Sequence, residues 1–132
     1  MRIAVSIVGL VLLASCSMPT RVELANLSLQ AIVVTSMSRD EGPVSIAVRD
    51  SAELQGLDMP IRTAFSVAIG GDVLRYETSR VPEDYIRTGF TGRKLKAQFG
   101  ADRCIRLLRP EQDVLDPVAT PQPAGFPLCP RG

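Results

Sequence analysis

Few residues in this chain of 132 have the type and spacing that enzymatic chemistry requires. Histidine is absent, which removes Ser-His-Asp and Cys-His nucleophile pairs, His-ligated zinc and the HExxH motif. Carboxylate pairs can perform acid-base chemistry without histidine, but no spacing here singles out a pair. We therefore expect a protein that is not an enzyme and that holds no cofactor or metal. An enzyme would have to use Asp50, Glu53, Glu83, Asp84, Tyr76 or Tyr85.

The first sixteen residues have the pattern of an export signal. Arg2 gives a small positive charge and an uncharged apolar run follows from Ile3 to Ala14. This run is shorter than the roughly 20 residues of a membrane-spanning helix, but it suits a signal peptide. Leu13-Ala14-Ser15-Cys16 closely resembles the lipobox of bacterial lipoprotein precursors. The alternatives are an ordinary secretory signal with a chance cysteine and a buried first strand.

The lipobox resemblance implies a processing route and a location. It implies cleavage before Cys16, a diacylglyceryl thioether on its sulfur and acylation of the new amino terminus. Such a multiply acylated cysteine holds a protein firmly at a membrane, because one acyl chain alone gives only marginal binding. Ser17 follows the cysteine, whereas Asp at that position retains some lipoproteins at the inner membrane. We therefore expect a periplasm-facing protein of the outer membrane, with the inner membrane as the alternative.

Length and charge limit the remaining possibilities. Removal of the leader leaves 117 residues, which suits one domain. The 15 basic and 14 acidic residues become 14 of each when Arg2 is lost. This neutral balance gives no support to a nucleic-acid partner. The expected organisation is a signal peptide (1–15), a lipidated linker (16–20), a β domain (21–109) and a proline-rich tail (110–132).

The β domain is predicted from short stretches in which apolar and polar residues alternate. Val22 and Leu24 begin the first stretch, and the uncharged run from Leu27 to Thr35 predicts a strand buried on both faces. Gly70-Gly71 lies between two such stretches and predicts a β-hairpin, because glycine accepts the positive φ of tight hairpin turns. A second hairpin is predicted with its turn at 100–102, and one helical turn at 82–86.

About seven short strands predict an all-β fold, a small antiparallel β-sandwich of the Ig-like or transthyretin-like type. The tail, from Pro110 onward, is rich in proline and favours polyproline II or disorder. The predicted core comprises Ile32, Val34, Ile46, Val48, Phe65, Val67, Ile69, Leu95, Phe99, Ile105 and Leu107.

Two cysteines, Cys104 and Cys129, remain when Cys16 is lipidated. Export to an oxidising compartment predicts that they form a disulfide, and two free thiols are the alternative. Because Ile105 and Leu107 are expected to point inward, Cys104 should point outward. The bridge would then cross the outer surface of the second hairpin and bring Phe126 and Leu128 onto that surface.

Basic residues are concentrated on the second hairpin, residues 93–109. Within 87–109 the acidic residue is Asp102 alone. One interpretation is a face that binds lipid phosphates or an acidic protein. The other is a solvated face that discourages edge pairing, and we favour it because charge runs are usually solvated. The residues that would bind an anion are Arg93, Lys94, Lys96, Arg103 and Arg106.

These observations leave two functional classes apart from an enzyme. The first is a membrane-anchored lipoprotein that acts as a structural or accessory component of a cell-envelope assembly, with an envelope protein as partner. This class rests on analogy of fold and anchor, since small β-sandwich lipoproteins serve bacterial secretion and pilus systems. The alternative is a binding module for an anionic envelope ligand that uses the basic hairpin.

Overall fold

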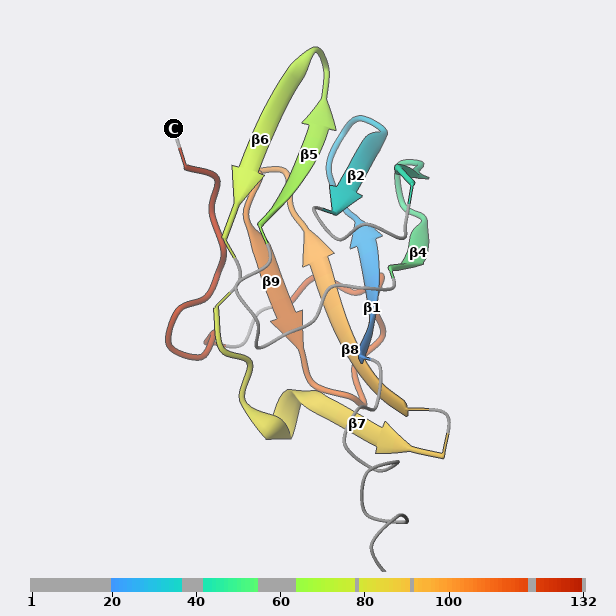
Figure 1. The fold of residues 1–132 in the computed structure, drawn as a ribbon, viewed down its shortest axis with the longest axis vertical. Coiled ribbons are helices and arrows are strands. Elements are labelled where there is room, and N and C mark those ends of the chain that lie inside the picture. Colours follow the sequence, from blue (N-terminus) through green and yellow to red (C-terminus); the bar gives the residue numbers. More distant parts are fainter. Residues whose placement is uncertain are drawn as a thin grey trace, which may run out of the picture.

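The computed structural model describes residues 20–36, 42–54, 64–77, 79–90, 92–118 and 121–131. The predicted signal peptide and the lipobox with Cys16 lie outside the described residues, as does the connection 55–63. The described residues form two facing β-sheets, which confirms the predicted all-β sandwich (Figure 1).

One sheet contains five strands and the other contains four. The five-stranded sheet has the order β4 (Ser51–Leu54), β1 (Thr20–Asn26), β8 (Gly92–Phe99) and β7 (Ile86–Gly89), with β9 (Ile105–Leu108) also paired to β8. The four-stranded sheet has the order β3 (Val44–Ile46), β2 (Ile32–Ser36), β5 (Phe65–Ile69) and β6 (Asp72–Tyr76). The predicted helical turn is the short 3-10 helix η3 (Glu83–Tyr85).

Strand β8 organises the five-stranded sheet. Its whole length pairs with β1, from Thr20 opposite Arg93 to Asn26 opposite Phe99. Its other edge is divided between β7 and β9. The β1–β8 pair is parallel, whereas every other strand pair in the two sheets is antiparallel. The described sandwich is therefore antiparallel apart from one central parallel pair.

Both predicted hairpins are present. In the first, Ile69 pairs with Asp72, so Gly70 and Gly71 form a two-residue turn with φ angles of 56° and 87°. A type I′ hairpin turn requires positive φ at both positions, which explains the glycine pair. In the second, β8 and β9 pair from Lys96 opposite Leu108 to Phe99 opposite Ile105.

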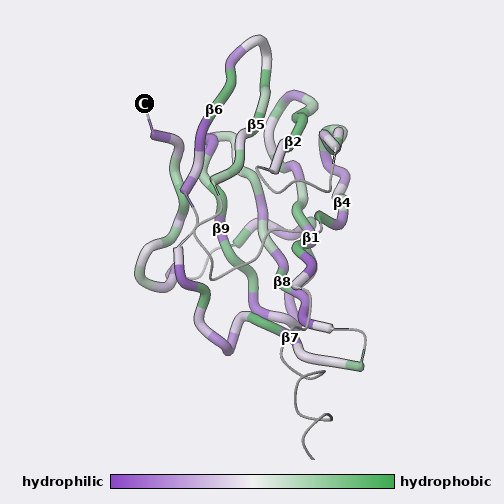
Figure 2. Tube along the Cα trace, in the orientation of Figure 1, coloured by the Kyte–Doolittle hydropathy of each residue, from purple (hydrophilic) through white to green (hydrophobic). Residues whose placement is uncertain are grey.

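The core lies between the two sheets, and alternate residues of the strands supply it (Figure 2). Ten of the eleven predicted core residues are buried. The exception is Val48, which is 43% exposed. This prediction was wrong because β3 ends at Ile46 and a turn follows, in which Arg49 has a φ of 59°. The alternation of residues 44–49 therefore spans a strand and the turn after it.

The predicted single strand from Leu27 to Thr35 is also wrong. Residues 28–30 form a bend, so β1 ends at Asn26 in one sheet and β2 begins at Ile32 in the other. Leu29 lies in this bend and is 88% exposed. Asn and Ser side chains bond nearby backbone groups and so compete with strand pairing. The pair Asn26 and Ser28 therefore turns the chain despite its uncharged surroundings.

Asn26 is completely buried, and all its polar atoms have partners. Its side-chain Nδ2 donates to the carbonyls of Gln30 (2.8 Å) and Ile46 (3.1 Å). Its Oδ1 accepts from the Ser28 backbone N–H (3.0 Å) and from the Ser28 hydroxyl (2.6 Å). Its backbone N–H donates to Asp50 O and its carbonyl accepts from Arg49 N. One side chain thus joins the β1–β2 bend to the β3–β4 connection.

Asn26→Ala should lower the free energy of unfolding by roughly 2–4 kcal/mol. The reason is that it leaves several buried partners unsatisfied, at about 1–3 kcal/mol each before relaxation. Ser28→Ala is the matched control, since it removes fewer bonds, and it should cost about 1 kcal/mol. Urea denaturation of the purified protein measures both. Equal midpoints for Asn26→Ala and the parent chain would contradict this role of Asn26.

The tail is held against the five-stranded sheet by polar side chains. Lys96 Nζ donates to the carbonyls of Pro110 (3.0 Å) and Gln112 (2.8 Å). Gln98, which is buried on the same face of β8, donates through Nε2 to the carbonyls of Val114 and Asp116. Sequence composition predicts polyproline II or disorder for this segment. These bonds instead give its backbone carbonyls fixed partners.

The end of the tail covers the free edge of β9. The Gln122 amide accepts from Leu107 N (2.7 Å) and donates to Leu107 O (3.0 Å), as a neighbouring strand would. Ile105 exchanges two backbone hydrogen bonds with Leu128. An uncovered strand edge invites pairing with other chains, so the tail protects this edge.

The predicted disulfide between Cys104 and Cys129 is present, with a Cα–Cα distance of 4.3 Å. It follows from the antiparallel bridge between Ile105 and Leu128, whose register places the two cysteines directly opposite. Leu107 and Leu128 lie in the core with Phe126. The predicted path across the outer surface is therefore wrong, because the tail joins the edge of β9 and turns Phe126 and Leu128 inward between the sheets.

Replacing both Cys104 and Cys129 by Ser should lower the free energy of unfolding by about 2–4 kcal/mol, since the bridge closes a loop of moderate length. It should also expose the chain after Pro110 to proteases, because Phe126 and Leu128 lose their fixed position in the core. Denaturant titration and limited proteolysis test the two effects. Protease resistance that survives the double substitution would show that Gln122 and the core contacts hold the tail without the bridge.

Candidate functional site

The five residues predicted to bind an anion do not converge on one point. Arg93 and Lys94 lie near the start of β8, Lys96 lies in its middle, and Arg103 and Arg106 lie at the far end of the hairpin. Each has a polar partner within the chain. Anion binding at this hairpin therefore remains a prediction that requires these partners to be displaced.

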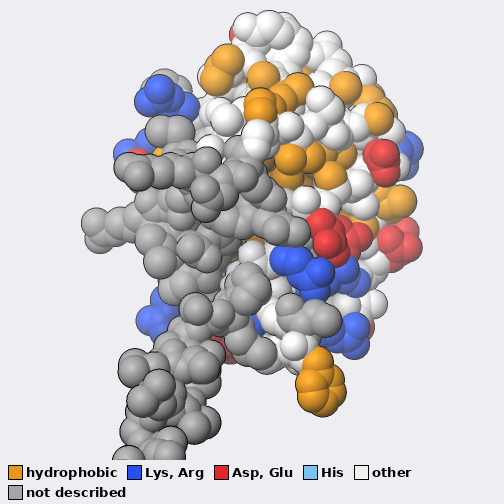
Figure 3. Space-filling model, turned by 45° about the vertical axis from the view of Figure 1, so that its right-hand side comes forward, with side chains coloured by type: hydrophobic (Ala, Val, Ile, Leu, Met, Phe, Trp, Pro, Cys, Tyr) orange, Lys and Arg blue, Asp and Glu red, His pale blue; other side chains and the backbone are white. Residues whose placement is uncertain are grey.

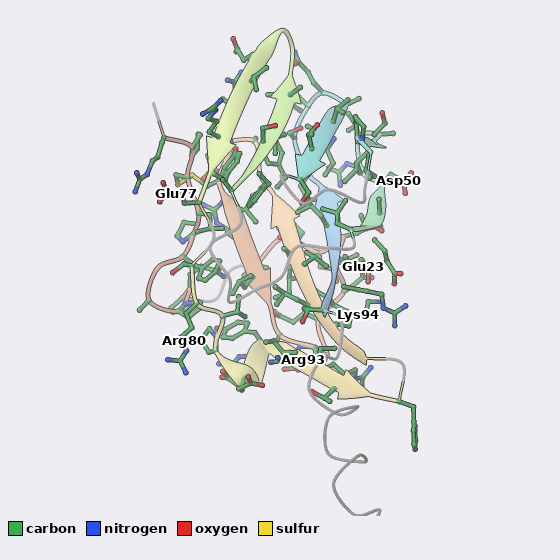
Figure 4. All side chains as sticks on the ribbon, in the orientation of Figure 1. Glu23, Asp50, Glu77, Arg80, Arg93 and Lys94 are labelled. Carbon is green, nitrogen blue, oxygen red and sulfur yellow. A yellow bond between two sulfur atoms is a disulfide. The ribbon has the colours of Figure 1, made fainter. Side chains whose placement is uncertain are left out.

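Arg93 and Lys94 are each held by acidic side chains (Figure 4). Arg93 Nη2 lies 2.7 Å from Glu83 Oε1. Lys94 Nζ lies 3.0 Å from Glu23 and 3.4 Å from Glu53. Glu23 and Glu53 face each other across the β1–β4 pair, an arrangement that is unfavourable for like charges. Lys94 lies between them, and its hydrogen bond to Glu23 raises the pKa of the Lys94 ammonium.

The far end of the hairpin contains a forked ion pair. Arg106 donates through Nη1 and Nη2 to the two carboxylate oxygens of Asp102, at 3.0 and 2.6 Å. The hydrogen bonds from Arg106 lower the pKa of Asp102, so the carboxylate stays charged to a lower pH than usual. Gly100 leaves room for this pair, because a Cβ there would lie 2.8 Å from Asp102 Oδ1.

A hollow of about 440 Å³ opens beside this ion pair. Its walls combine the Asp102–Arg106 pair with the apolar side chains of Leu27, Pro117 and Val118. Arg103, the other basic residue of the turn, forms a salt bridge with Asp72, in which Nη1 lies 3.1 Å from Oδ2. The charge of Arg106 is balanced by Asp102, so the hollow has no excess positive charge from its described lining.

Three of the six residues that an enzyme could use, Glu83, Asp84 and Tyr85, form η3, and the other three lie on separate segments. Glu53, Glu83 and Asp84 form ion pairs with different basic residues. Asp50 accepts a hydrogen bond from Ser51 N in a turn, and Arg109 lies over the ring of Tyr85 at 4.9 Å. Arg109 thus contacts two of the six candidates, Asp84 and Tyr85, which are neighbours in η3.

The outer faces of the two sheets differ in charge. The face of the five-stranded sheet carries the charged residues Arg21, Glu23, Glu53, Lys94 and Lys96. Figure 3 shows hydrophobic side chains gathered in the upper part of the view, with charged side chains at its edges and in a cluster below. The described outward residues of the four-stranded sheet include one charge, Arg75, and are otherwise Val33, Thr35, Ser45, Ser66, Ala68 and Val73.

We call the central row of this surface, Ser45, Val33, Ala68 and Val73, the uncharged row; the strand register places these residues side by side. Val73 is 69% exposed. Sequence reasoning identified these strands but did not identify their outer face as a candidate site. The available signal was the lack of charge at alternate positions of the 32–36 and 65–69 stretches.

Tyr76 is the most perturbed acid among the described residues. It is buried, stacks on Phe65 with ring centroids 5.1 Å apart, and donates to Arg103 O at 2.6 Å. Burial raises the pKa of Tyr76 to about 12. The bond joins the four-stranded sheet to the turn of the β8–β9 hairpin in the other sheet.

Stability should therefore fall between pH 10 and about 12, where the unfolded tyrosine loses its proton and the folded one keeps it. Because the folded pKa is raised, the full stability is present below pH 10. The loss should reach roughly 2–3 kcal/mol, at 1.36 kcal/mol for each pH unit. Tyr76→Phe is the control and should show a smaller decline. If the free energy of unfolding declined equally with pH in Tyr76→Phe and in the parent chain, the decline would not come from Tyr76.

Across the parts of the chain that the structure covers, no cluster of acidic residues or cysteines is arranged to hold a metal ion. None of the described helices is long and apolar enough to cross a membrane. Comparison with protein-family models, with curated proteins and with solved structures finds no match to this chain.

Proposed function

We propose that the chain is a lipoprotein anchored through acylated Cys16 at the periplasmic side of the outer membrane. Its β-sandwich acts there as a structural or accessory component of a cell-envelope assembly, with an envelope protein as its partner. The observation that carries the proposal is the lipobox Leu13-Ala14-Ser15-Cys16, followed at Thr20 by the first strand of the sandwich.

Two features of the sandwich support export and anchoring. The Cys104–Cys129 disulfide suits an oxidising compartment such as the periplasm. β1 begins four residues after Cys16, and an extended chain covers at most about 14 Å over that distance. An acylated Cys16 would therefore keep the sandwich close to the bilayer.

The uncharged row supports a protein partner. Val73 is exposed in this row, and Val33 and Ala68 beside it are half-buried. The row lies on a sheet whose neighbouring outward positions are mostly small and uncharged. Because the centre of a protein interface is depleted in charged residues, this row suits a protein better than an anion.

The experiment combines mass analysis with purification of the tagged full chain in mild detergent. Intact mass should give a chain that starts at Cys16 and carries acyl groups, and Cys16→Ala should give an unprocessed or unlipidated form. A stoichiometric protein should accompany the parent chain. Val73→Lys should reduce its recovery at least tenfold, which corresponds to about 1.4 kcal/mol.

Leu29→Lys is the matched control, because Leu29 is also an exposed apolar residue but lies in the β1–β2 bend away from the uncharged row. It should retain the partner. Bound anionic lipid without a protein would support the anion-binding alternative. A product without acyl groups, cut at another site, would overturn the anchor.

A further inference from the structure

We propose that the tip of the β7–β8 hairpin, with Phe90 at its end, inserts into the interface of the same bilayer leaflet that holds Cys16. This inference rests on the proposed lipid anchor and adds a second contact with the membrane. It assigns the sandwich a fixed orientation, in which the β7–β8 end faces the bilayer.

The register of the strands places the tip beside the point where the chain enters the sandwich. Thr20 is the pairing partner of Arg93, so their backbones are one strand spacing apart, about 4.8 Å. Because β1 and β8 are parallel, both strands begin at this end (Figure 1). Gly89 pairs with Gly92, so Phe90 lies in the turn just beyond the start of β8. Thr20, where the described residues begin, and the turn with Phe90 therefore lie at the same end of the sandwich.

Phe90 is fully exposed, which is unusual for a large aromatic side chain. The other described large apolar residues that are exposed, Leu29, Val48, Val73 and Leu115, do not lie in this turn. Leu29 follows the end of β1 and Val73 follows the Gly70-Gly71 turn, so both are remote from the β7–β8 tip. The β7–β8 tip thus presents a single aromatic group at the end nearest to Cys16.

The surroundings of Phe90 suit the headgroup region. Arg87, Thr88 and Gly89 are exposed on β7. Arg87 forms no salt bridge with a described residue, in contrast to Arg93 and Lys94. Interfacial segments combine an inserted apolar group, such as Phe, with basic side chains near lipid phosphates. The occupant that fits this end is therefore a lipid surface, reached within the about 14 Å that the linker allows.

The test uses the absence of tryptophan from the chain. Phe90→Trp and Leu29→Trp each introduce a single tryptophan, at the tip and at the far end. Both full chains are isolated in the lipidated form and reconstituted into phosphatidylethanolamine–phosphatidylglycerol vesicles, with and without lipids brominated on the acyl chain near the headgroup. Phe90→Trp should show blue-shifted emission and lose about half of it or more to the brominated lipid, since interfacial groups lie roughly 5–10 Å into the leaflet. Leu29→Trp should keep solvent-like, unquenched emission.

The outcomes separate the inference from the anchor. If both variants float with the vesicles and carry acyl groups, but Phe90→Trp is as unquenched as Leu29→Trp, the insertion of the tip is refuted and the lipid anchor stands. Equal quenching of both variants refutes the proposed orientation. A chain that carries no acyl group and does not float with the vesicles overturns both proposals.

Discussion

The sandwich depends on a buried amide at the point where the chain passes from one sheet to the other. Asn26 has no solvent exposure, and its two side-chain donors and its acceptor are all used within the chain. A buried polar network that is fully satisfied specifies a unique arrangement, and an incomplete one is costly. The bonds from Asn26 to Gln30 and Ile46 fix the β1–β2 bend against the end of β3. These bonds thereby set which residues of β1 and of β2 face the core between the two sheets.

Polar side chains of the basic hairpin also form their hydrogen bonds within the chain. Lys96 and Gln98 lie on the outer face of β8, yet their donors end on carbonyls of the tail. Proline cannot supply N–H groups to a sheet, so a proline-rich segment can be held through its carbonyls by side-chain donors. Gln122 performs the complementary task at β9, where its amide replaces a strand. Among the five cations predicted to bind an anion, Lys96 therefore holds the backbone of the tail, whereas the other four pair with carboxylates.

The sequence predicted what depends on local chemistry and short-range alternation. Gly70-Gly71 specifies its hairpin because only a few residues tolerate two successive positive φ angles. The prediction failed at Leu27, which belongs to an uncharged run with the pattern of a strand. The bonds of Asn26 to Ser28 and to the distant carbonyl of Ile46 turn the chain there. The parallel pairing of β1 with β8 could not be predicted either. Alternation shows which residues of a strand share a face, but it does not show which strand lies beside it. The spacing of residues in the sequence does not show which carboxylates pair with Arg106 and Lys94, because that depends on the strand register. Spacing alone therefore could not test whether the cations converge on one site.

The parallel β1–β8 pair also links the fold to the proposed function. Because both strands start at one end, Thr20 and the β7–β8 tip are brought together there. An anchor at this end would leave the Gly70-Gly71 hairpin and the uncharged row on β3, β2, β5 and β6 directed away from the bilayer (Figure 1). A lipid chain alone fixes the distance of a domain from the membrane but not its rotation. A second contact through Phe90 would restrict that rotation, and it would present the uncharged row to a partner in a constant direction.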